Sequence, residues 1–242
     1  MVFLLAGCEV IKEEDRLIPV PAGQSSTRRH VLLEFTGFRC VNCPTASEIA
    51  EELQAYYGES LLIVSLHPAS NPFTQGKYDY TCQAADSIYL LLGGTETTPF
   101  PAGNIDMKPY KETSFTDMQE WATMTYQAMQ DTVAPHLSAK TQADSVTREV
   151  KITIDHNTLT NTHTENWLVE DSVTGPQAMP DGTINMTYNH RHILRAATKT
   201  NTLRVPDECR WEQCRIITLL IDNNTNQILQ ANETTLDFRT DY

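Results

Sequence analysis

The sequence has few basic residues and no long apolar segment. Its 242 residues include 18 Lys and Arg against 31 Asp and Glu, which gives a formal net charge of −13. Nucleic-acid binding needs clustered Lys and Arg to neutralise phosphates, so this balance argues against a nucleic-acid partner. No apolar run reaches the roughly 18–20 residues of a membrane-spanning helix. The protein is therefore not predicted to cross a membrane as a helix.

Several familiar signatures are also missing. The sequence has no internal repeat, no Gly-rich phosphate loop and no Gly-x-Ser-x-Gly nucleophile motif. The composition is that of an ordinary globular protein, 40% hydrophobic and 20% charged, and the length suits one large or two modest domains. The first half alternates strand-like and helix-like stretches, whereas Asn, Thr and Asp separate short apolar runs from Thr147 onward. This shift in composition predicts two domains.

A short apolar run at the N-terminus ends in a cysteine. Residues 5–8, Leu-Ala-Gly-Cys, resemble a bacterial lipobox, where signal peptidase cuts before a cysteine that carries diacylglycerol. The run is brief and no Lys or Arg precedes it, so an apolar strand with a core cysteine is the alternative. The polar, proline-flanked segment that follows has the composition of a tether. We expect a signal remnant at 1–8, a tether at 9–28, and membrane attachment through lipid on Cys8.

A CxxC motif follows the first predicted strand. Residues 31–35 form a short apolar run typical of a buried strand, and residues 46–57 have the apolar spacing of a helix. Cys40 and Cys43 therefore lie at a strand-to-helix junction. The partial positive charge of a helix N-terminus, with Arg39 beside it, favours a Cys40 thiolate. We expect Cys40 to face outward and attack disulfides, and Cys43 to resolve the mixed disulfide.

Other interpretations of this pair are a structural disulfide, an inert relic of a redox site, or half of a zinc site. Zinc would need two more ligands, and Cys209 and Cys214 are the second pair that the sequence offers. In an oxidising compartment we expect two disulfides, Cys40–Cys43 and a structural Cys209–Cys214. Cys82 is then left free, either buried or as a third redox thiol.

Periodicity and turn signals predict further elements. Helices are expected over 79–92 and over 116–130, the second opened by a Thr116-x-x-Gln119 capping box. Strands are expected over 61–66, 150–154, 166–170, 183–196, 215–221 and 227–231. His190 and His192 would share one strand face and could hold a metal. No third ligand is near them by spacing, so packing is favoured, and no metal or cofactor is expected.

Residues 31–44, Val-Leu-Leu-Glu-Phe-Thr-Gly-Phe-Arg-Cys-Val-Asn-Cys-Pro, resemble the first strand and helix of thioredoxin-like proteins. The resemblance gives Glu34 the place of the buried carboxylate beneath the cysteines, where it could relay a proton to or from Cys43. Arg39 replaces the usual tryptophan before the first cysteine. That departure argues against the typical docking of thioredoxin partners.

Residues 97–106 resemble the segment that carries the cis-proline of the thioredoxin fold. Pro101 is the candidate for this proline, and Pro99 is the competing assignment. A cis bond there would turn backbone towards the first cysteine, so that a peptide substrate could pair beside it.

Residues 167–177 and 188–195, together with the CxxC block, resemble the outer membrane protein 28-related lipoprotein family of Bacteroidetes. The resemblance spans roughly residues 29–232. It implies an α/β thioredoxin-like domain at 29–140 followed by an all-β immunoglobulin-like sandwich domain at 141–242. It also implies a cell-envelope lipoprotein of the outer membrane.

Two functions follow from these features. The first is thiol–disulfide exchange on the thiols of exported proteins, with Cys40, Cys43, Glu34 and Pro101 as the catalytic residues. The second is a non-enzymatic envelope lipoprotein whose thioredoxin-like fold and sandwich recognise a protein or glycan partner. The reduction potential of the CxxC pair separates these two hypotheses.

Overall fold

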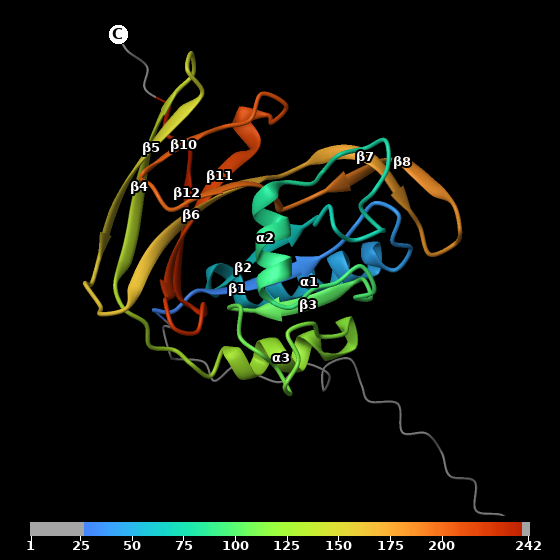
Figure 1. The fold of residues 1–242 in the computed structure, drawn as a ribbon, viewed down its shortest axis with the longest axis horizontal. Coiled ribbons are helices and arrows are strands. Elements are labelled where there is room, and N and C mark those ends of the chain that lie inside the picture. The colour runs from blue at the N-terminus through green and yellow to red at the C-terminus, as the bar shows by residue number, and fades with distance from the viewer. Residues whose placement is uncertain (1–26, 239–242) are drawn as a thin grey trace, which may run out of the picture.

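The computed structural model describes residues 27–238, so Cys8 and almost all of the expected tether lie outside the described residues (Figure 1). The α-helices are α1 (Cys43–Tyr57), α2 (Gln83–Leu91) and α3 (Trp121–Ala128). Short 3-10 helices cover Gly58–Ser60, Met118–Glu120 and Trp211–Gln213. The strands are β1 (His30–Phe35), β2 (Leu61–Leu66), β3 (Ala102–Ile105), β4 (Leu137–Asp144), β5 (Glu149–His156), β6 (Thr162–Glu170), β7 (Val173–Ala178), β8 (Ile184–His190), β9 (Ile193–Thr198), β10 (Thr202–Arg204), β11 (Cys214–Asp222) and β12 (Ile228–Thr235).

The first half of the described chain has the predicted thioredoxin-like arrangement. β1 pairs in parallel with β2 and antiparallel with β3, and α1 connects β1 to β2. Both faces of β1 and β2 are buried, which explains why their sequences are continuous apolar runs rather than alternating ones. α1 and α3 pack over Leu32 and Ile63 on one face, and α2 packs over Leu33 and Val64 on the other.

Two helix starts differ from the sequence prediction. α2 begins four residues later than expected because Cys82 is its N-cap, with its Sγ accepting a hydrogen bond from the Ala85 amide at 3.4 Å. The prediction of a capping box at Thr116 is wrong. The Thr116 backbone instead exchanges two hydrogen bonds with Gly103, at 2.8 and 2.9 Å, and Asp117 caps the turn that follows. The chain after β3 thus uses Thr116 as a β-bridge.

The strands of the second half extend the sheet of the first. One seven-stranded sheet has the order β12-β11-β6-β9-β2-β1-β3, and β9 meets β2 in parallel where the Ser65 amide donates to the His192 carbonyl at 2.7 Å. The sheet therefore runs across the domain boundary expected at residue 140. Figure 1 shows these late strands, in yellow to red, continuing the sheet that begins with β1.

A second layer covers part of this long sheet. β10, β5 and β4 form a three-stranded sheet that packs on β6 and β11 through an apolar cluster. The cluster contains Val150, Ile152, Leu168, Leu203 and Ile216. The β-rich character of the second half was predicted correctly. An immunoglobulin-like sandwich is not confirmed, because one of the two layers is the same sheet that holds β1 and β2.

The strand predicted over 183–196 is two strands. β8 pairs with β7 in a separate two-stranded sheet, and β9 joins the main sheet. The break lies at His192, whose φ of 56° is a left-handed conformation that interrupts an extended chain. His190 and His192 therefore do not share a strand face, and the arrangement assumed for a metal site there is wrong.

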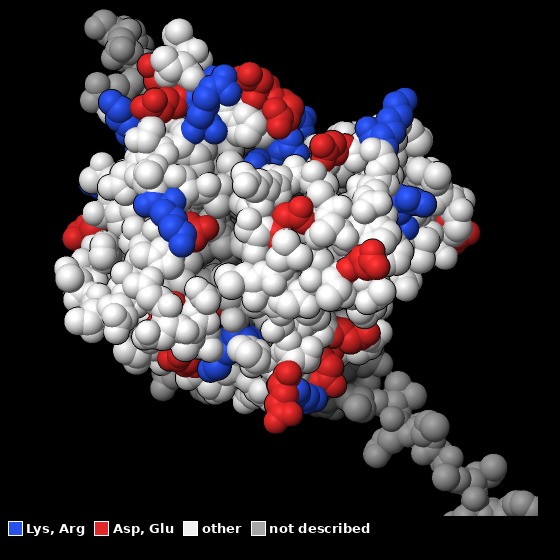
Figure 2. All heavy atoms as spheres, viewed as in Figure 1, with Lys and Arg blue, Asp and Glu red and all other residues white. Residues whose placement is uncertain are grey.

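On the face drawn in Figure 2, acidic and basic side chains are interspersed, and the Lys and Arg side chains stand apart from one another. No helix within residues 27–238 is both long and apolar enough to span a membrane.

The β7–β8 hairpin is held against the first half by a close packing contact at Gly175. A Cβ atom at this position would lie 1.7 Å from the Tyr80 hydroxyl, and Tyr80 is buried against His190 with ring centroids 4.5 Å apart. We expect Gly175→Ala to lower the free energy of unfolding by about 1–3 kcal/mol, measured by urea denaturation. Thr174→Ala, at an exposed neighbouring position, should change it by less than about 0.5 kcal/mol. Equal effects of the two substitutions would contradict this packing.

Candidate functional site

Cys40 and Cys43 form a disulfide at the start of α1, with their Cα atoms 5.4 Å apart. Cys43 is the first residue of the helix and Pro44 follows it, a position where the missing amide hydrogen is not needed. The Cys40 amide donates to the Gly37 carbonyl at 3.0 Å, which closes the turn between β1 and the helix. The strand-to-helix placement predicted from the sequence is therefore the one that the structure has.

The expectation that Cys40 faces outward is wrong, because both cysteines are buried. Cys40 is 2% exposed and Cys43 is 1% exposed. β7 covers the motif from one side, where the side-chain Nε2 of Gln177 donates to the Cys40 carbonyl at 2.8 Å. From the other side the 67–82 loop approaches, and its Phe73 carbonyl accepts from the Arg39 amide at 3.0 Å. Segments that are distant in sequence therefore bury the CxxC motif, which the local sequence alone predicted to be exposed.

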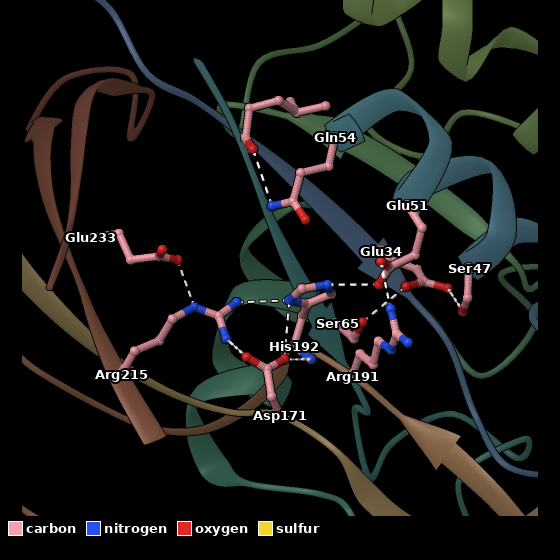
Figure 3. Close-up of polar contacts among 11 residues, drawn as sticks. Glu34, Ser47, Glu51, Gln54, Ser65, Asp171, Arg191, His192, Arg215 and Glu233 are labelled. Carbon is pink, nitrogen blue, oxygen red and sulfur yellow. Dashed lines mark hydrogen bonds and ion pairs between the residues drawn. The ribbon is translucent and has the colours of Figure 1, made fainter. Parts of the chain in front are cut away.

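Glu34 is buried beneath the start of α1, as the resemblance implied. It is 2% exposed and accepts hydrogen bonds from the hydroxyls of Ser47 on α1, at 2.5 Å, and Ser65 on β2, at 2.8 Å (Figure 3). Burial raises the pKa of Glu34 above its ordinary value of 4.5, and the two hydroxyl hydrogen bonds oppose this without cancelling it. A carboxyl in this state can hold or release a proton beside the disulfide.

Pro101 carries the cis peptide bond of the described residues, after Phe100. The competing assignment to Pro99 is wrong, because its peptide bond is not cis. The preceding Phe100 is buried in the same apolar cluster as the two cysteines, and its ring stacks on Phe73 at a centroid distance of 6.0 Å.

A cavity of about 400 Å³ lies between α1 and β8 at the start of the helix. Its lining includes Glu34, Cys43 and Ser47 but not Cys40. His67 and His190 form one wall, with ring centroids 6.1 Å apart. Burial lowers the pKa of His67 well below its ordinary value and that of His190 to about 4, so both rings are neutral near pH 7.

An ion-pair network ties α1 to the late strands (Figure 3). His192 Nε2 lies 2.8 Å from Glu51 on α1, and its Nδ1 lies 3.2 Å from Asp171 and 2.7 Å from the Arg215 guanidinium. Arg215 also pairs with Asp171 and, at 2.6 Å, with Glu233 on β12. The network fixes the junction of β9 and β2 beside the buried Glu34.

The pKa values in this network give the fold a pH dependence with two limits. Burial opposes ionisation of Asp171, but its hydrogen bond with His192 and the charge of Arg215 outweigh burial and lower its pKa to about 2. The stability that ionised Asp171 contributes to the fold is present above pH 3.8 and is lost as the pH falls towards 2. Burial also opposes protonation of His192, but Asp171 and Glu51 raise its pKa above 6.5. The stability that protonated His192 contributes to the fold is complete below pH 6.5 and is lost as the pH rises through the pKa of His192 in the folded state.

We therefore expect the free energy of unfolding to fall at both ends of the range from pH 2 to pH 9. Urea denaturation at each pH measures it. His192→Asn should remove the decline at the alkaline end. His136→Asn should leave that decline in place, because the His136 side chain is 56% exposed and its one carboxylate contact, with Asp155, is 3.3 Å long. The same alkaline decline in both variants would contradict the role given to His192.

Of the other cysteines, Cys82 packs against the apolar cluster that holds the CxxC pair. Cys82 is a free thiol, as expected, and donates to the Leu194 carbonyl at 3.2 Å. Cys209 and Cys214 are buried in the second apolar cluster, away from the first cluster that holds the CxxC pair, so the structure does not assemble a four-cysteine zinc site.

Cys209 and Cys214 are thiols in mutual contact rather than the expected disulfide. The hydrogen bond from Cys214 and the contact with Arg195 lower the pKa of Cys209. Arg195 Nε donates to the Cys209 sulfur at 3.2 Å. Oxidative pairing of these two residues stays a prediction, which peptide mapping without reduction tests.

Sequence reasoning missed three residues of this site. Gln177 covers Cys40, Tyr188 lines the cavity from β8, and His67 directly follows β2. Only His67 has a local signal, because a polar residue at the carboxyl end of a buried parallel strand is placed to face a site. The positions of the other two depend on the pairing of β7 with β8, which periodicity does not reveal.

Comparison of the sequence with models of known families and with curated proteins gives no match. Among solved structures, HBP35 of Porphyromonas gingivalis is similar, with a TM-score of 0.62 and 14% identity, over 91% of this chain and 79% of that one. Protein AGR_C_4864 from Agrobacterium tumefaciens has a TM-score of 0.52 and 13% identity, over 89% of this chain and 97% of that one. These likenesses establish a shared fold.

A domain of the outer membrane lipoprotein Omp28 from Porphyromonas gingivalis also aligns, over 45% of this chain and 92% of that domain, with 14% identity. Its TM-score of 0.29 is too low to support a shared fold. The strand pairing and the site themselves define a thioredoxin-like fold with a CxxC disulfide, followed by a β-rich half.

Proposed function

We propose that this chain is a cell-envelope lipoprotein of the outer membrane that exchanges disulfides with the thiols of exported proteins. The observation that carries the proposal is the Cys40–Cys43 disulfide at the start of α1, with the buried carboxyl of Glu34 nearby. A helix N-terminus stabilises a thiolate, and a buried acid of raised pKa supplies or accepts the proton that exchange requires.

Each residue has a stated role in this reaction. In the reduced protein the Cys40 thiolate attacks one sulfur of a client disulfide and releases the other as a thiol. Cys43 then attacks the Cys40 sulfur of the mixed disulfide. This attack reforms the Cys40–Cys43 bond and releases the client's second sulfur. Glu34 accepts the Cys43 proton, and the family resemblance gives Pro101 the role of orienting the client. Gln177 must release the Cys40 backbone before a protein client can reach it.

A stoichiometric transfer experiment tests the proposal. Protein reduced with dithiothreitol and freed of reductant is mixed with insulin, and both are then alkylated and analysed by mass spectrometry. We expect one insulin disulfide to be reduced per Cys40–Cys43 bond formed. The Gln177→Ala variant should reduce insulin faster, because β7 then loses its hydrogen bond to the Cys40 carbonyl. Insulin that stays oxidised while Cys40 and Cys43 stay reduced would contradict exchange activity.

The second candidate is a binding lipoprotein that recognises a protein or glycan, with the disulfide as a structural bond. The burial of both cysteines beneath β7 and the 67–82 loop favours it. The two candidates differ in one property. A structural disulfide should become reducible only when the protein unfolds, whereas an exchanging one should be reduced in the folded state.

Envelope attachment through Cys8 is proposed from the sequence, because this residue lies outside the described part of the chain. Expressed in a Gram-negative host with a complete signal peptide, the mature protein should begin at a diacylated Cys8 and fractionate with membranes. Cys8→Ser should release it into the periplasm. Mass spectrometry of the N-terminus decides this, and an unmodified cysteine would exclude the anchor.

A further inference from the structure

The cavity between α1 and β8 gives the two sulfurs of the disulfide unequal surroundings. Cys43 belongs to its lining, together with Glu34 and Ser47, and Cys40 does not. Cys40 is instead enclosed where Gln177 and the 67–82 loop meet it. A small molecule that enters the cavity therefore approaches the bond from the side of Cys43. At about 400 Å³ the space falls in the range of small-molecule sites.

One buried polar atom in the lining lacks a partner. His67 is 2% exposed, and its Nδ1 has no hydrogen bond among the described residues. Leaving such an atom unpaired costs free energy, which a hydrogen-bond donor bound beside it would offset. Burial keeps the His67 ring neutral by lowering its pKa, so a ring nitrogen of His67 can accept a hydrogen bond but is a weak base.

The charge around the cavity favours a cation. Glu48 and Glu52 of α1 are exposed members of the lining, and neither carboxylate is hydrogen-bonded within residues 27–238. Arg191 and His192 line the cavity as well, but each is paired with Glu51 at 2.8 Å. A positively charged ligand is therefore attracted to this opening, and an anionic one is repelled.

We propose that this cavity admits a small thiol that carries a positive charge, and that the thiol reduces the disulfide by attacking Cys43. The proposal rests on the exchange function above. It names the class of reductant that returns the Cys40–Cys43 disulfide to the dithiol form. The thiolate sulfur bonds to Cys43 Sγ, the Cys43–Cys40 bond breaks, and its electron pair leaves on Cys40. A second thiol attacks the ligand sulfur of the mixed disulfide and releases the Cys43 thiolate. Two thiols thus become one disulfide, and their two protons pass to the protein's dithiol.

The leaving group supports this direction of attack. Attack on Cys43 expels Cys40, which adjoins the N-terminus of α1 and follows Arg39 in the chain. A thiolate stabilised by such positive charge leaves faster, and exchange rates rise as the pKa of the leaving thiol falls.

The test uses the oxidised protein and three thiols of different charge: cysteamine, 2-mercaptoethanol and 2-mercaptoethanesulfonate. Rates of reduction at low salt are divided by the concentration of each thiolate. We expect cysteamine to exceed the sulfonate by about tenfold, and the Glu48→Gln, Glu52→Gln double variant to remove most of that preference. In acid-quenched samples, tandem mass spectrometry should place the cysteamine adduct on Cys43 and leave Cys40 free to alkylate.

The outcomes separate this inference from the proposed function. An adduct on Cys40, or equal normalised rates for the three thiols, would overturn the inference while leaving exchange activity intact. A folded protein whose disulfide resists all three thiols would overturn both. Because the two glutamates are exposed, their substitution by glutamine should not prevent folding, and circular dichroism checks this.

Discussion

Cys40→Ser should abolish catalytic insulin reduction in excess dithiothreitol, with a loss on the order of 10³-fold. The mechanism needs one thiolate to bond to the client sulfur, and serine at this position cannot form that bond under the same conditions. Cys43→Ser should also lower turnover, because dithiothreitol must then release the client in place of Cys43. Mixed with insulin in the absence of free dithiothreitol, the reduced variant can attack through Cys40 but cannot release the client, so a stable mixed disulfide should accumulate.

The matched control is Cys82→Ser, because Cys82 is a free, partly buried thiol at the start of α2. Burial raises the pKa of Cys82, so it should not contribute to exchange near neutral pH. We expect this variant to keep wild-type turnover. Full activity in Cys40→Ser, or its loss in Cys82→Ser, would place the reactive thiol elsewhere in the protein.

Arg215→Met should lower the free energy of unfolding by about 2–3 kcal/mol, the largest stability effect that we expect from replacing one polar side chain. The Arg215 side chain is 11% exposed and binds Asp171 and Glu233, which are both 34% exposed. Removing it leaves two partly buried carboxylates without their shared cation. Because water reaches the carboxylates, the effect should be smaller than for a fully buried pair.

Urea denaturation at pH 7 measures this change, and Arg204→Met is the control. Arg204 pairs with Asp207 at 2.8 Å, but the two side chains are 59% and 74% exposed. Its replacement should change the free energy of unfolding by at most about 1 kcal/mol. A loss for Arg215→Met no larger than that for Arg204→Met would show that the network does not hold β9 and β2 together.

The thioredoxin-like first half could be predicted because its signals are local. The apolar runs of β1 and β2, the amphipathic spacing of α1 and the CxxC motif between them each follow from neighbouring residues. The position of Glu34 in β1 and of Pro101 immediately before β3 came from resemblance. Both lie as expected, because Glu34 is buried and the Phe100–Pro101 peptide bond is cis.

The arrangement of the second half could not be predicted, because it depends on pairings between distant residues. β9 joins β2 across more than a hundred residues, and nothing in either strand's periodicity specifies its neighbour. His192 was placed within a continuous strand, but its left-handed φ divides that strand in two. The burial of Cys40 beneath Gln177 is a consequence of the same topology.

The most direct test of the account is a redox titration of the Cys40–Cys43 disulfide in the folded protein. The protein is equilibrated in dithiothreitol buffers of graded potential, alkylated and analysed by mass spectrometry, while circular dichroism follows the fold. We expect a single reversible two-electron transition with the fold retained, and a displaced midpoint in Glu34→Gln. A disulfide that is reduced only as the protein unfolds would contradict the account and leave a thioredoxin-like scaffold used for binding.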